Sequence, residues 1–265
     1  MVDFERKERY NINDLVEIMR LLRAPGGCPW DAEQTHESIK KNLIEETYEV
    51  VEAINKKDNE LLCEELGDLL MQVVFHACME SEKDVFDFDD VCNGVCQKLV
   101  ERHPHVFGET KISGVEDVLT NWDDIKRKSK GQKTTTQSML SVPRELPALM
   151  RATKLQKKAA DVGFDWNDVS GALDKLQEEI DELRQAVENK DSQNMNEELG
   201  DVLFSAVNVS RFIKSDAEEA LTAASDKFLA RFTTVEKLAQ ERGVDMKSST
   251  IEELDKLWDE AKSVN

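Results

Sequence analysis

The sequence predicts an all-α protein built from two tandem copies of one helical bundle domain. Apolar residues recur every three or four positions along most of the chain, which is the pattern of amphipathic helices. Only 5 prolines and 11 glycines interrupt the 265 residues, so long helices are favoured over a many-turned β fold. A pair of acidic motifs in the first half returns in the second half, which indicates a duplication.

Two pairs of helices carry the apolar pattern. In the first half, one stripe consists of Leu43, Thr47, Val50 and Ile54, and the next of Leu62, Leu66, Leu69 and Val73. In the second half, the matching stripes are Leu173, Leu176, Ile180, Leu183 and Val187, then Leu199, Val202, Leu203, Ala206 and Val209. The polar run 191–196, DSQNMN, is a natural turn, so we expect the second pair to form an antiparallel hairpin.

A polar segment divides the chain into two parts of similar size. Residues 130–141, KGQKTTTQSMLS, are rich in Thr, Ser and Gln and precede Pro143 and Pro147. This composition is typical of a mobile connection without a packed core. We therefore predict an N-terminal domain at residues 1–130, a linker at 131–142 and a C-terminal domain at 143–265.

The duplicated acids form the most specific pattern in the chain. Each copy has E-x-x-E on one helix and E-x-x-D on the next, and one constant shift of 133 residues relates the two sets. They are Glu46, Glu49, Glu65 and Asp68 in the first copy and Glu179, Glu182, Glu198 and Asp201 in the second. Spacing of three residues places each pair on one helix face, so the hairpin could bring four carboxylates together.

Four carboxylates at close range repel one another and raise each other's pKa, and a bound cation would resolve this. Oxygen ligands without Cys or His favour Mg²⁺ or Mn²⁺ over zinc or copper. A di-iron site is disfavoured because neither copy has the Glu-x-x-His motif. Any single E-x-x-E motif could instead be part of an ordinary solvent-exposed helix face that binds no metal.

Several other residues are duplicated outside the acids. Lys98 and Arg102 match Lys227 and Arg231, Trp122 matches Trp258, and Trp30 matches Trp166. Lys227 and Arg231 lie one turn apart, as suits phosphate binding, although they could be an ordinary exposed pair. Trp258 could stack on a base or pack in a core. Asn208 is either a polar group of a pocket or a core amide. Gly67 and Gly200 indicate close helix approach, a nearby ligand or a tolerated defect.

Composition excludes several functional classes. The 55 acidic and 35 basic residues give a net charge of −20, which argues against unassisted nucleic-acid binding but allows a polyphosphate bridged by divalent cations. The five cysteines form no C-x-x-C pair, as expected in a reducing cytoplasm. The N-terminus is charged, and no run of 18 apolar residues is present, so we expect neither a secretory signal nor a membrane span. Glycine-rich phosphate-binding motifs are also absent from the sequence.

The chain resembles the MazG family across nearly its whole length. The similarity is carried by CPWDAEQTHESI, EETYEVVEAI, EELGDLLMQVVFHA, KLVERHPHVFG and LPALMRATKLQKKAADVGFDW. It implies a helical domain of the all-α nucleoside triphosphate pyrophosphohydrolase superfamily, related to dimeric dUTPases. It further implies hydrolysis of NTPs and dNTPs, ATP included, to monophosphates and pyrophosphate by attack of water at the α-phosphorus. A role in controlling or cleansing the nucleotide pool would follow, with Mg²⁺ as cofactor (or Mn²⁺ as substitute) and a cytoplasmic homodimer as the assembly.

The resemblance also implies roles for particular residues. The C-terminal copy is the main catalytic candidate, with Glu179, Glu182, Glu198 and Asp201 as metal ligands and catalytic residues. Glu46, Glu49, Glu65 and Asp68 would form a second site. The substrate-binding residues would be Lys175, Glu178, Glu197, Lys227, Arg231 and Trp258. Glu178 or Glu197 could accept the proton of the attacking water.

Two alternatives stay open at this point. One is a catalytically weak helical scaffold that regulates other proteins by binding nucleotides or a basic protein partner. It explains the charge and the duplication, but not the repeated acids followed by Lys and Arg one helix later. The other narrows the substrate of the enzyme to a damaged or deoxy nucleotide.

Overall fold

The computed structural model describes residues 4–110 and 131–264, together with Gly114, Val118, Trp122 and Ile125. The regular structure of these residues is helical, without any β-strand, so the predicted all-α class is confirmed. The chain divides into two compact units, Met1–Lys126 and Arg127–Asn265, which we call the first and the second unit. The domain boundaries predicted at residues 130 and 143 stay predictions.

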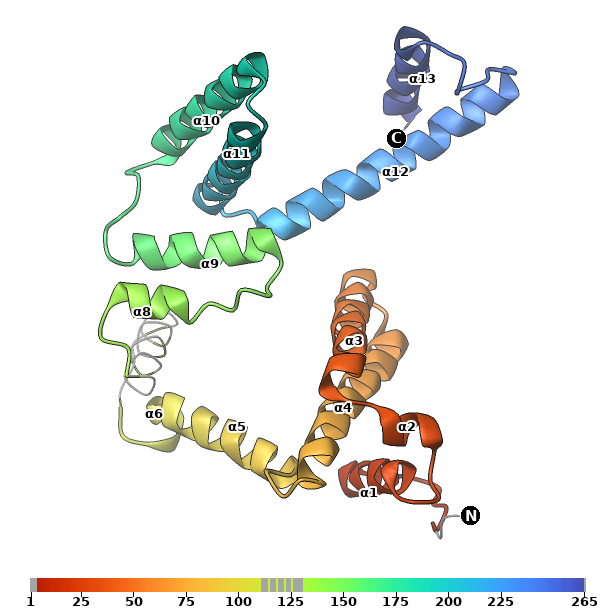
Figure 1. The fold of residues 1–265 in the computed structure, drawn as a ribbon, viewed down its shortest axis with the longest axis vertical. Coiled ribbons are helices and arrows are strands. Elements are labelled where there is room, and N and C mark those ends of the chain that lie inside the picture. The colour runs from red at the N-terminus through yellow and green to blue at the C-terminus, as the bar shows by residue number, and fades with distance from the viewer. Residues whose placement is uncertain are drawn as a thin grey trace. The chain divides into compact units, whose positions relative to one another are not determined.

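The first unit is built on a helical hairpin, α3 with α4, and α1 packs against α4 (Figure 1). Its described helices are α1 (Ile12–Arg23), α2 (Pro29–Glu33), α3 (His36–Lys56), α4 (Asn59–Ser81), α5 (Phe88–Arg102) and α6 (Pro104–Phe107). Met19 of α1, Ile39 of α3 and Phe75 of α4 lie in one buried apolar cluster. This cluster fixes α1 against the hairpin at the end where α3 begins.

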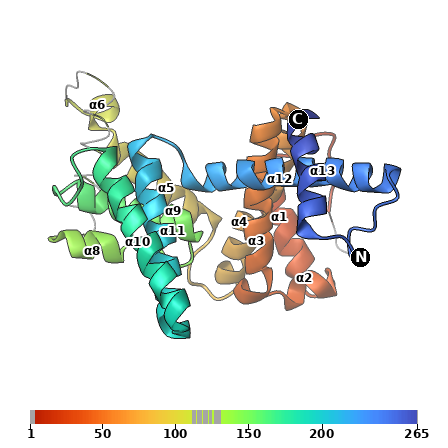
Figure 2. The same ribbon diagram turned by 90° about the horizontal axis from the view of Figure 1, so that it is seen from above.

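The second unit repeats this plan with a hairpin of α10 and α11 against α9 (Figures 1 and 2). Its helices are α8 (Thr135–Leu140), α9 (Ala148–Ala160), α10 (Val169–Asn189), α11 (Ser192–Phe212), α12 (Ala217–Glu241) and α13 (Ile251–Val264). Helix α13 folds back along α12, and the two share a small core that includes Val235 and Leu257.

The two hairpins turn in the same way. Lys57 and Lys190 both adopt the left-handed conformation, with a φ of 56° in each case. The next residue, Asp58 or Asp191, then caps the following helix by accepting hydrogen bonds from two backbone N–H groups. The predicted antiparallel hairpin is therefore confirmed, but its turn is shorter than expected. Residues 192–196 belong to α11, because the Asp191 cap starts the helix immediately.

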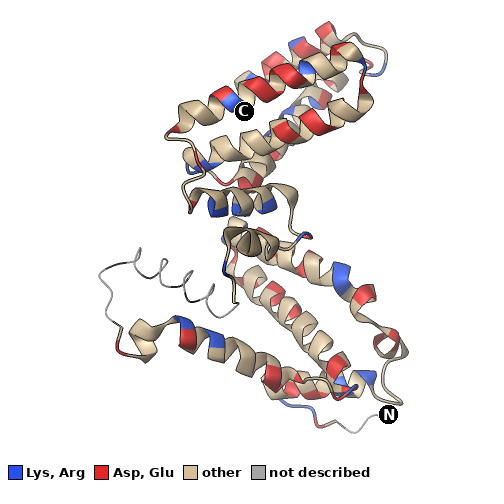
Figure 3. Ribbon diagram, turned by 60° about the vertical axis from the view of Figure 1, so that its left-hand side comes forward, with Lys and Arg blue, Asp and Glu red and all other residues tan. Residues whose placement is uncertain are grey.

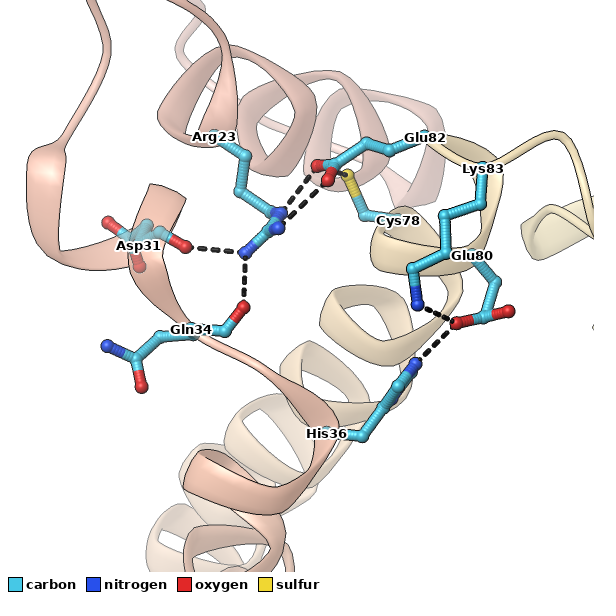
Figure 4. Close-up of polar contacts among 8 residues, drawn as sticks. All are labelled: Arg23, Asp31, Gln34, His36, Cys78, Glu80, Glu82 and Lys83. Atoms are coloured by element: carbon cyan, nitrogen blue, oxygen red, sulfur yellow. Dashed lines mark hydrogen bonds and ion pairs between the residues drawn. The ribbon is translucent and has the colours of Figure 1, made fainter.

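The end of α1 is fixed by a charged contact (Figure 4). The guanidinium of Arg23 binds the Glu82 carboxylate through two hydrogen bonds, of 2.5 and 2.9 Å, and also donates to the backbone oxygens of Asp31 and Gln34. The Arg23 side chain is only 7% exposed, so little of its charge is solvated. One side chain thus joins α1, the α2 region and the end of α4.

The segment expected to be an unpacked linker contains a helix. Residues 135–140 form α8, which is capped by Thr134 and packs against α9. Ser138 and Val142 are buried, and Lys158 of α9 donates a 2.5 Å hydrogen bond to the Ser138 hydroxyl. The expectation of a connection without packed structure is therefore wrong for this part of the segment. Thr and Gln are polar, but here they supply the capping box of a short helix.

Three further features concern the distribution of charge, the cysteines and the hydropathy of the helices. Acidic residues are spread over most helices of both units rather than gathered in one tail (Figure 3). The five cysteines are free thiols. Among the described residues, no helix is both long and apolar enough to cross a membrane.

Candidate active site

Three carboxylates from two helices meet in each unit. In the second unit, Glu179 and Glu182 of α10 face Glu198 of α11, and one carboxylate oxygen from each lies within 4.8 Å of the others. The matching group in the first unit consists of Glu46, Glu49 and Glu65. The hairpin therefore brings together three of the four acids that the sequence selects in each copy.

The fourth acid of each copy lies outside this tight group but within electrostatic reach of it. Burial is the main cause that raises the pKa of Glu198, and the charge of Asp201 adds to it. Burial also raises the pKa of Glu46, followed by the charge of Asp68. Both aspartates lie one turn beyond the glutamate of their own helix, on the same face.

The carboxylates destabilise one another's charged forms. Burial, followed by the charge of Glu179, raises the pKa of Glu182 above its ordinary value. Burial, followed by the charges of Glu182 and Glu179, raises the pKa of Glu198. In the first unit the pKa of Glu65 is raised in the same way, by burial and by Glu49. Such a cluster gains stability from a cation that neutralises it.

Lys175 supplies part of this neutralisation in the second unit. Its ammonium lies 2.7 Å from a Glu179 oxygen and 2.9 Å from a Glu178 oxygen. These two contacts raise the pKa of Lys175 far above its ordinary value. At the equivalent place the first unit has Asn42, which carries no charge. The two acidic clusters therefore differ, because a lysine lies at this position in the second unit and an uncharged residue in the first. This difference is visible in the sequence alone.

The cations and the tryptophan selected on later helices lie away from the cluster. Lys227 is exposed on α12, and within the described part of the chain neither Lys227 nor Arg231 forms an ion pair. Trp258 packs on the core shared by α12 and α13, with its ring 5.3 Å from that of Phe228. The single chain does not bring these three residues to the carboxylates.

The glycines beside the acids have open space around them. A Cβ atom added at Gly67 or Gly200 would meet no described heavy atom within 4 Å apart from its own helix backbone and chain neighbours. Close approach of another helix within the chain is therefore not the reason for either glycine. Two further residues are expected from the sequence to bind the substrate. Of these, Glu178 forms an ion pair with Lys175, and Glu197 is exposed on α11.

A cavity in the second unit includes residues that the sequence patterns do not select. Gln156, Phe164 and Arg211 line it. Asn208 lines it as well, which agrees with one of the two predictions made for this residue, a polar group of a pocket. Comparison of the two sequence copies could have indicated these residues, because the matched helices of the two units carry different residue types at these positions. The cavity itself depends on how α9 packs against α11, and sequence periodicity does not give that.

Comparison with known proteins gives a consistent result over both units. A model of the MazG nucleotide pyrophosphohydrolase domain matches the chain twice, at residues 34–107 and 168–237. The predicted tandem duplication is thereby confirmed. Each match begins near the start of the hairpin and ends beyond it, so both acidic clusters are included.

Full-length relatives show the same similarity. The chain is 45% identical to a nucleoside triphosphate pyrophosphohydrolase of Escherichia coli over 95% of its own length and 97% of that protein. It is also 45% identical to a Thermotoga maritima protein named nucleoside triphosphate pyrophosphohydrolase/pyrophosphatase MazG, over 94% of each chain. An uncharacterized Bacillus subtilis protein is 50% identical over 92% of this chain and half of its own length.

Proposed function

Because the chain belongs to the MazG nucleotide pyrophosphohydrolase family and is a hydrolase acting on phosphoanhydride bonds, we propose that it hydrolyses NTPs and dNTPs at the α-phosphorus. The products are nucleoside monophosphates and pyrophosphate, and the role is control or cleansing of the nucleotide pool. The carboxylate cluster of α10 and α11 carries this proposal, because three acids from two helices converge there and Lys175 contacts one of them, Glu179.

The donor set fits a hard divalent cation. Glu179, Glu182 and Glu198 offer only oxygen, their ligand atoms lie close enough to share one ion, and burial raises the pKa of two of them. Mg²⁺ prefers such ligands, and Mn²⁺ accepts them as well. Asp201 is the fourth proposed ligand. When bound, the cation supplies positive charge that neutralises the triphosphate and lowers the pKa of the attacking water.

The remaining residues bind the substrate and move the proton. Lys175 donates to a phosphate oxygen of the substrate, since its ammonium already lies at the edge of the cluster beside Glu179. Glu178 accompanies Lys175 and holds it in place. Glu197, exposed beside Glu198, then accepts the proton of the water.

The active form is proposed to be a homodimer. The hairpin and α12 expose large apolar side chains that a single chain leaves uncovered, among them Leu173, Leu203, Phe228 and Leu229. A second copy that covers these faces would also supply Lys227, Arg231 and Trp258 to the phosphates and the nucleoside. Contiguous exposed apolar faces are typical of surfaces that bind another protein. The substrate is a free nucleotide of the cytoplasm, with no role for nucleic acid or membrane.

Chromatography of reaction products tests the reaction. The purified protein is incubated with NTPs and dNTPs and Mg²⁺, in the presence or absence of EDTA. Monophosphates with stoichiometric pyrophosphate, abolished by EDTA, are the expected outcome. Diphosphates with free phosphate would show that a different bond is cut. No turnover with Mg²⁺, or with Mn²⁺ in its place, would instead favour the regulatory scaffold.

A further inference from the structure

A second cavity of the second unit, of about 410 Å³, lies between α8, α9 and the loop that joins them. We call it the α8–α9 cavity. Among the described residues, those that line it come from these three segments, and none belongs to α10 or α11. They include the apolar side chains Met139, Leu140 and Leu155 and two arginines, Arg144 and Arg151. The volume is that of a small-molecule site.

The two arginines of the α8–α9 cavity have no acidic partner in the described part of the chain. Arg144 is exposed, and neither it nor Arg151 forms an ion pair there. The Nε of Arg151 is buried and meets no acceptor among the described atoms. Glu218, the acid of α12 at the start of α9, instead accepts a hydrogen bond from the backbone N–H of Met150. A guanidinium stays charged, and a buried donor without an acceptor costs free energy, so this site favours an anion.

The first unit contains a helix equivalent to α9. Helix α1 packs against α4 as α9 packs against α11. One shift of 137 residues pairs the buried Met19 of α1 with the buried Gln156 of α9. The same shift pairs Gly26 with Gly163, which have positive φ angles of 87° and 83° just beyond the two helices. Buried and exposed positions also follow one another in nearly the same order along both helices. The two copies can therefore be compared residue by residue here.

The comparison shows that an ion pair of the first unit is replaced by two cations. In the first unit the ammonium of Lys7 lies 2.5 Å from a carboxylate oxygen of Asp14, which is buried at the start of α1. The shift of 137 places Arg144 at the position of Lys7 and Arg151 at the position of Asp14. Like charges repel, and the second unit has lost the carboxylate that balances them in the first. A negative charge from outside the chain would restore this balance.

We propose that the α8–α9 cavity binds a small organic phosphate between Arg144 and Arg151. The phosphate group supplies the negative charge that Asp14 supplies in the first unit. Arginine donors suit phosphate oxygens, because a guanidinium can form two parallel hydrogen bonds with them. Arg151 Nε gains the acceptor that the described residues do not offer. Thr136 also lines the cavity and adds a hydroxyl donor.

The apolar walls indicate that the ligand carries more than a phosphate group. Met139, Leu140 and Leu155 line the part of the cavity that the arginines leave. Leu140 is 79% exposed at the end of α8, so contact with a ligand would remove apolar surface from water. A phosphate monoester with an apolar body fits both the charge and these walls. Inorganic phosphate fits the charge alone.

The site is separate from the proposed active site and does not depend on the proposed function. The acidic cluster lies on α10 and α11, and neither helix contributes a described residue to the α8–α9 cavity. Carboxylates and phosphates repel each other, so phosphate binding at the cluster requires a divalent cation. Binding at the arginines requires none. Removal of divalent cations therefore leaves only the α8–α9 cavity able to hold a phosphate.

Calorimetry of binding without divalent cations tests the proposal. The full chain is passed over a chelating resin and titrated with phenyl phosphate, inorganic phosphate or benzoate. One phenyl phosphate per chain is expected to bind, more tightly than inorganic phosphate, which lacks the apolar body, or benzoate, which has a single charge. Absence of phenyl phosphate binding would overturn the proposal. Benzoate binding of equal affinity would overturn the assignment to a phosphate.

Two variants and a control locate the site. Arg151→Asp installs the residue of the first unit and should weaken phenyl phosphate binding by at least about ten-fold. The melting temperature without ligand should not fall, because the new carboxylate can pair with Arg144 as Asp14 pairs with Lys7. Arg144→Gln, at an exposed loop position, should also weaken binding and serves if Arg151→Asp does not fold.

Lys154→Gln is the matched control, because it also removes one positive charge, from an exposed position of α9 outside the cavity. It should bind phenyl phosphate like the unchanged protein. Equal weakening in Lys154→Gln and Arg144→Gln would mean that the anion responds only to overall charge and would overturn the site. Unchanged binding in every folded arginine variant would overturn it as well.

Discussion

His36 and His76 stack in parallel, with ring centroids 4.9 Å apart and an Nδ1–Nδ1 distance of 2.6 Å. His36 begins α3 and His76 lies on α4, so the pair joins the two helices of the first hairpin. His36 Nε2 also lies 2.6 Å from a Glu80 oxygen, which Lys83 contacts as well (Figure 4). The second unit has Val169, Val209 and Ile213 at the three matching positions. Polar side chains of one copy are thus replaced by apolar side chains in the other.

The first prediction concerns acid sensitivity. Burial, followed by the charge of His36, lowers the pKa of His76 below its ordinary value of 6.5. The unfolded chain therefore binds more protons than the folded one, so stability is full above that value and falls as the pH drops through it. We expect the protection factors of amide hydrogen exchange in α3 and α4, taken relative to the intrinsic exchange rate at each pH, to fall between pH 7.5 and pH 5.5. His76→Val, which copies Val209, should show a smaller fall, and an equal fall would contradict the assignment.

The second prediction separates the two acidic clusters. Glu179→Gln keeps the size of the side chain but removes a charge from the proposed catalytic site, so NTP hydrolysis should fall by more than about 100-fold. Glu46→Gln makes the same change at the matching position of the first unit and should leave most activity in place. Rates are measured by pyrophosphate release, with circular dichroism to confirm folding. Equal losses in both variants would mean that the two units share the reaction.

The third prediction concerns the balance of charge in the second cluster. The pKa of Glu182 is raised by burial and by Glu179, so without a cation the stability of the second unit falls as the pH rises through that pKa. Mg²⁺ should raise the melting temperature at pH 8 and have little effect at pH 4. Glu182→Gln should be more stable than the unchanged protein without Mg²⁺ and should gain less from it. Calorimetric scans that show no Mg²⁺ effect at pH 8 would argue against a metal site.

The fourth prediction concerns the contact between Arg23 and Glu82. Arg23→Met should destabilise the first unit by about 2 kcal/mol, because a shielded guanidinium loses charge-assisted hydrogen bonds to a carboxylate and to two backbone oxygens. Arg184→Met removes an exposed pair with Asp181 and should cost less than about 0.5 kcal/mol. Urea titrations measure both values. Similar costs for the two variants would show that shielding of Arg23 contributes nothing.

The fifth prediction tests a helical glycine. Gly200→Ala adds a Cβ where the described residues leave open space, so the better helix propensity of alanine should stabilise α11 by about 0.5–1 kcal/mol. Gly67→Ala should do the same in α4. Thermal unfolding gives the change for each variant. A loss of stability would place another surface, such as a second copy of the chain, against the glycine.

Much of the fold follows from local pattern. The stripe that contains Leu173 and the stripe that contains Leu199 predict α10 and α11 because helical periodicity is a property of neighbouring residues. The convergence of Glu179 with Glu198 also follows, since a short turn forces the helices to run antiparallel. These predictions needed only spacing and the physical chemistry of carboxylates.

Other features depend on contacts between segments far apart in the sequence. Thr135 and Gln137 have a linker composition, yet they lie in a helix because α9 offers a surface for it. The stacking of His36 on His76 joins residues 40 positions apart, and no periodic signal marks it. The cavity at Gln156 likewise arises from packing of α9 against α11. Comparison of the two copies position by position is the sequence signal that comes closest to it.

The distribution of free thiols makes the two halves of the molecule separately observable. The cysteines all lie in the first unit, and Cys78 is the buried one. Burial also raises the pKa of the Cys78 thiol, which slows its reaction with a labelling reagent in the folded state. The rate at which a thiol reagent labels Cys78 therefore reports the opening of the first unit alone. The second unit contains no cysteine, so its unfolding does not contribute to the labelling signal.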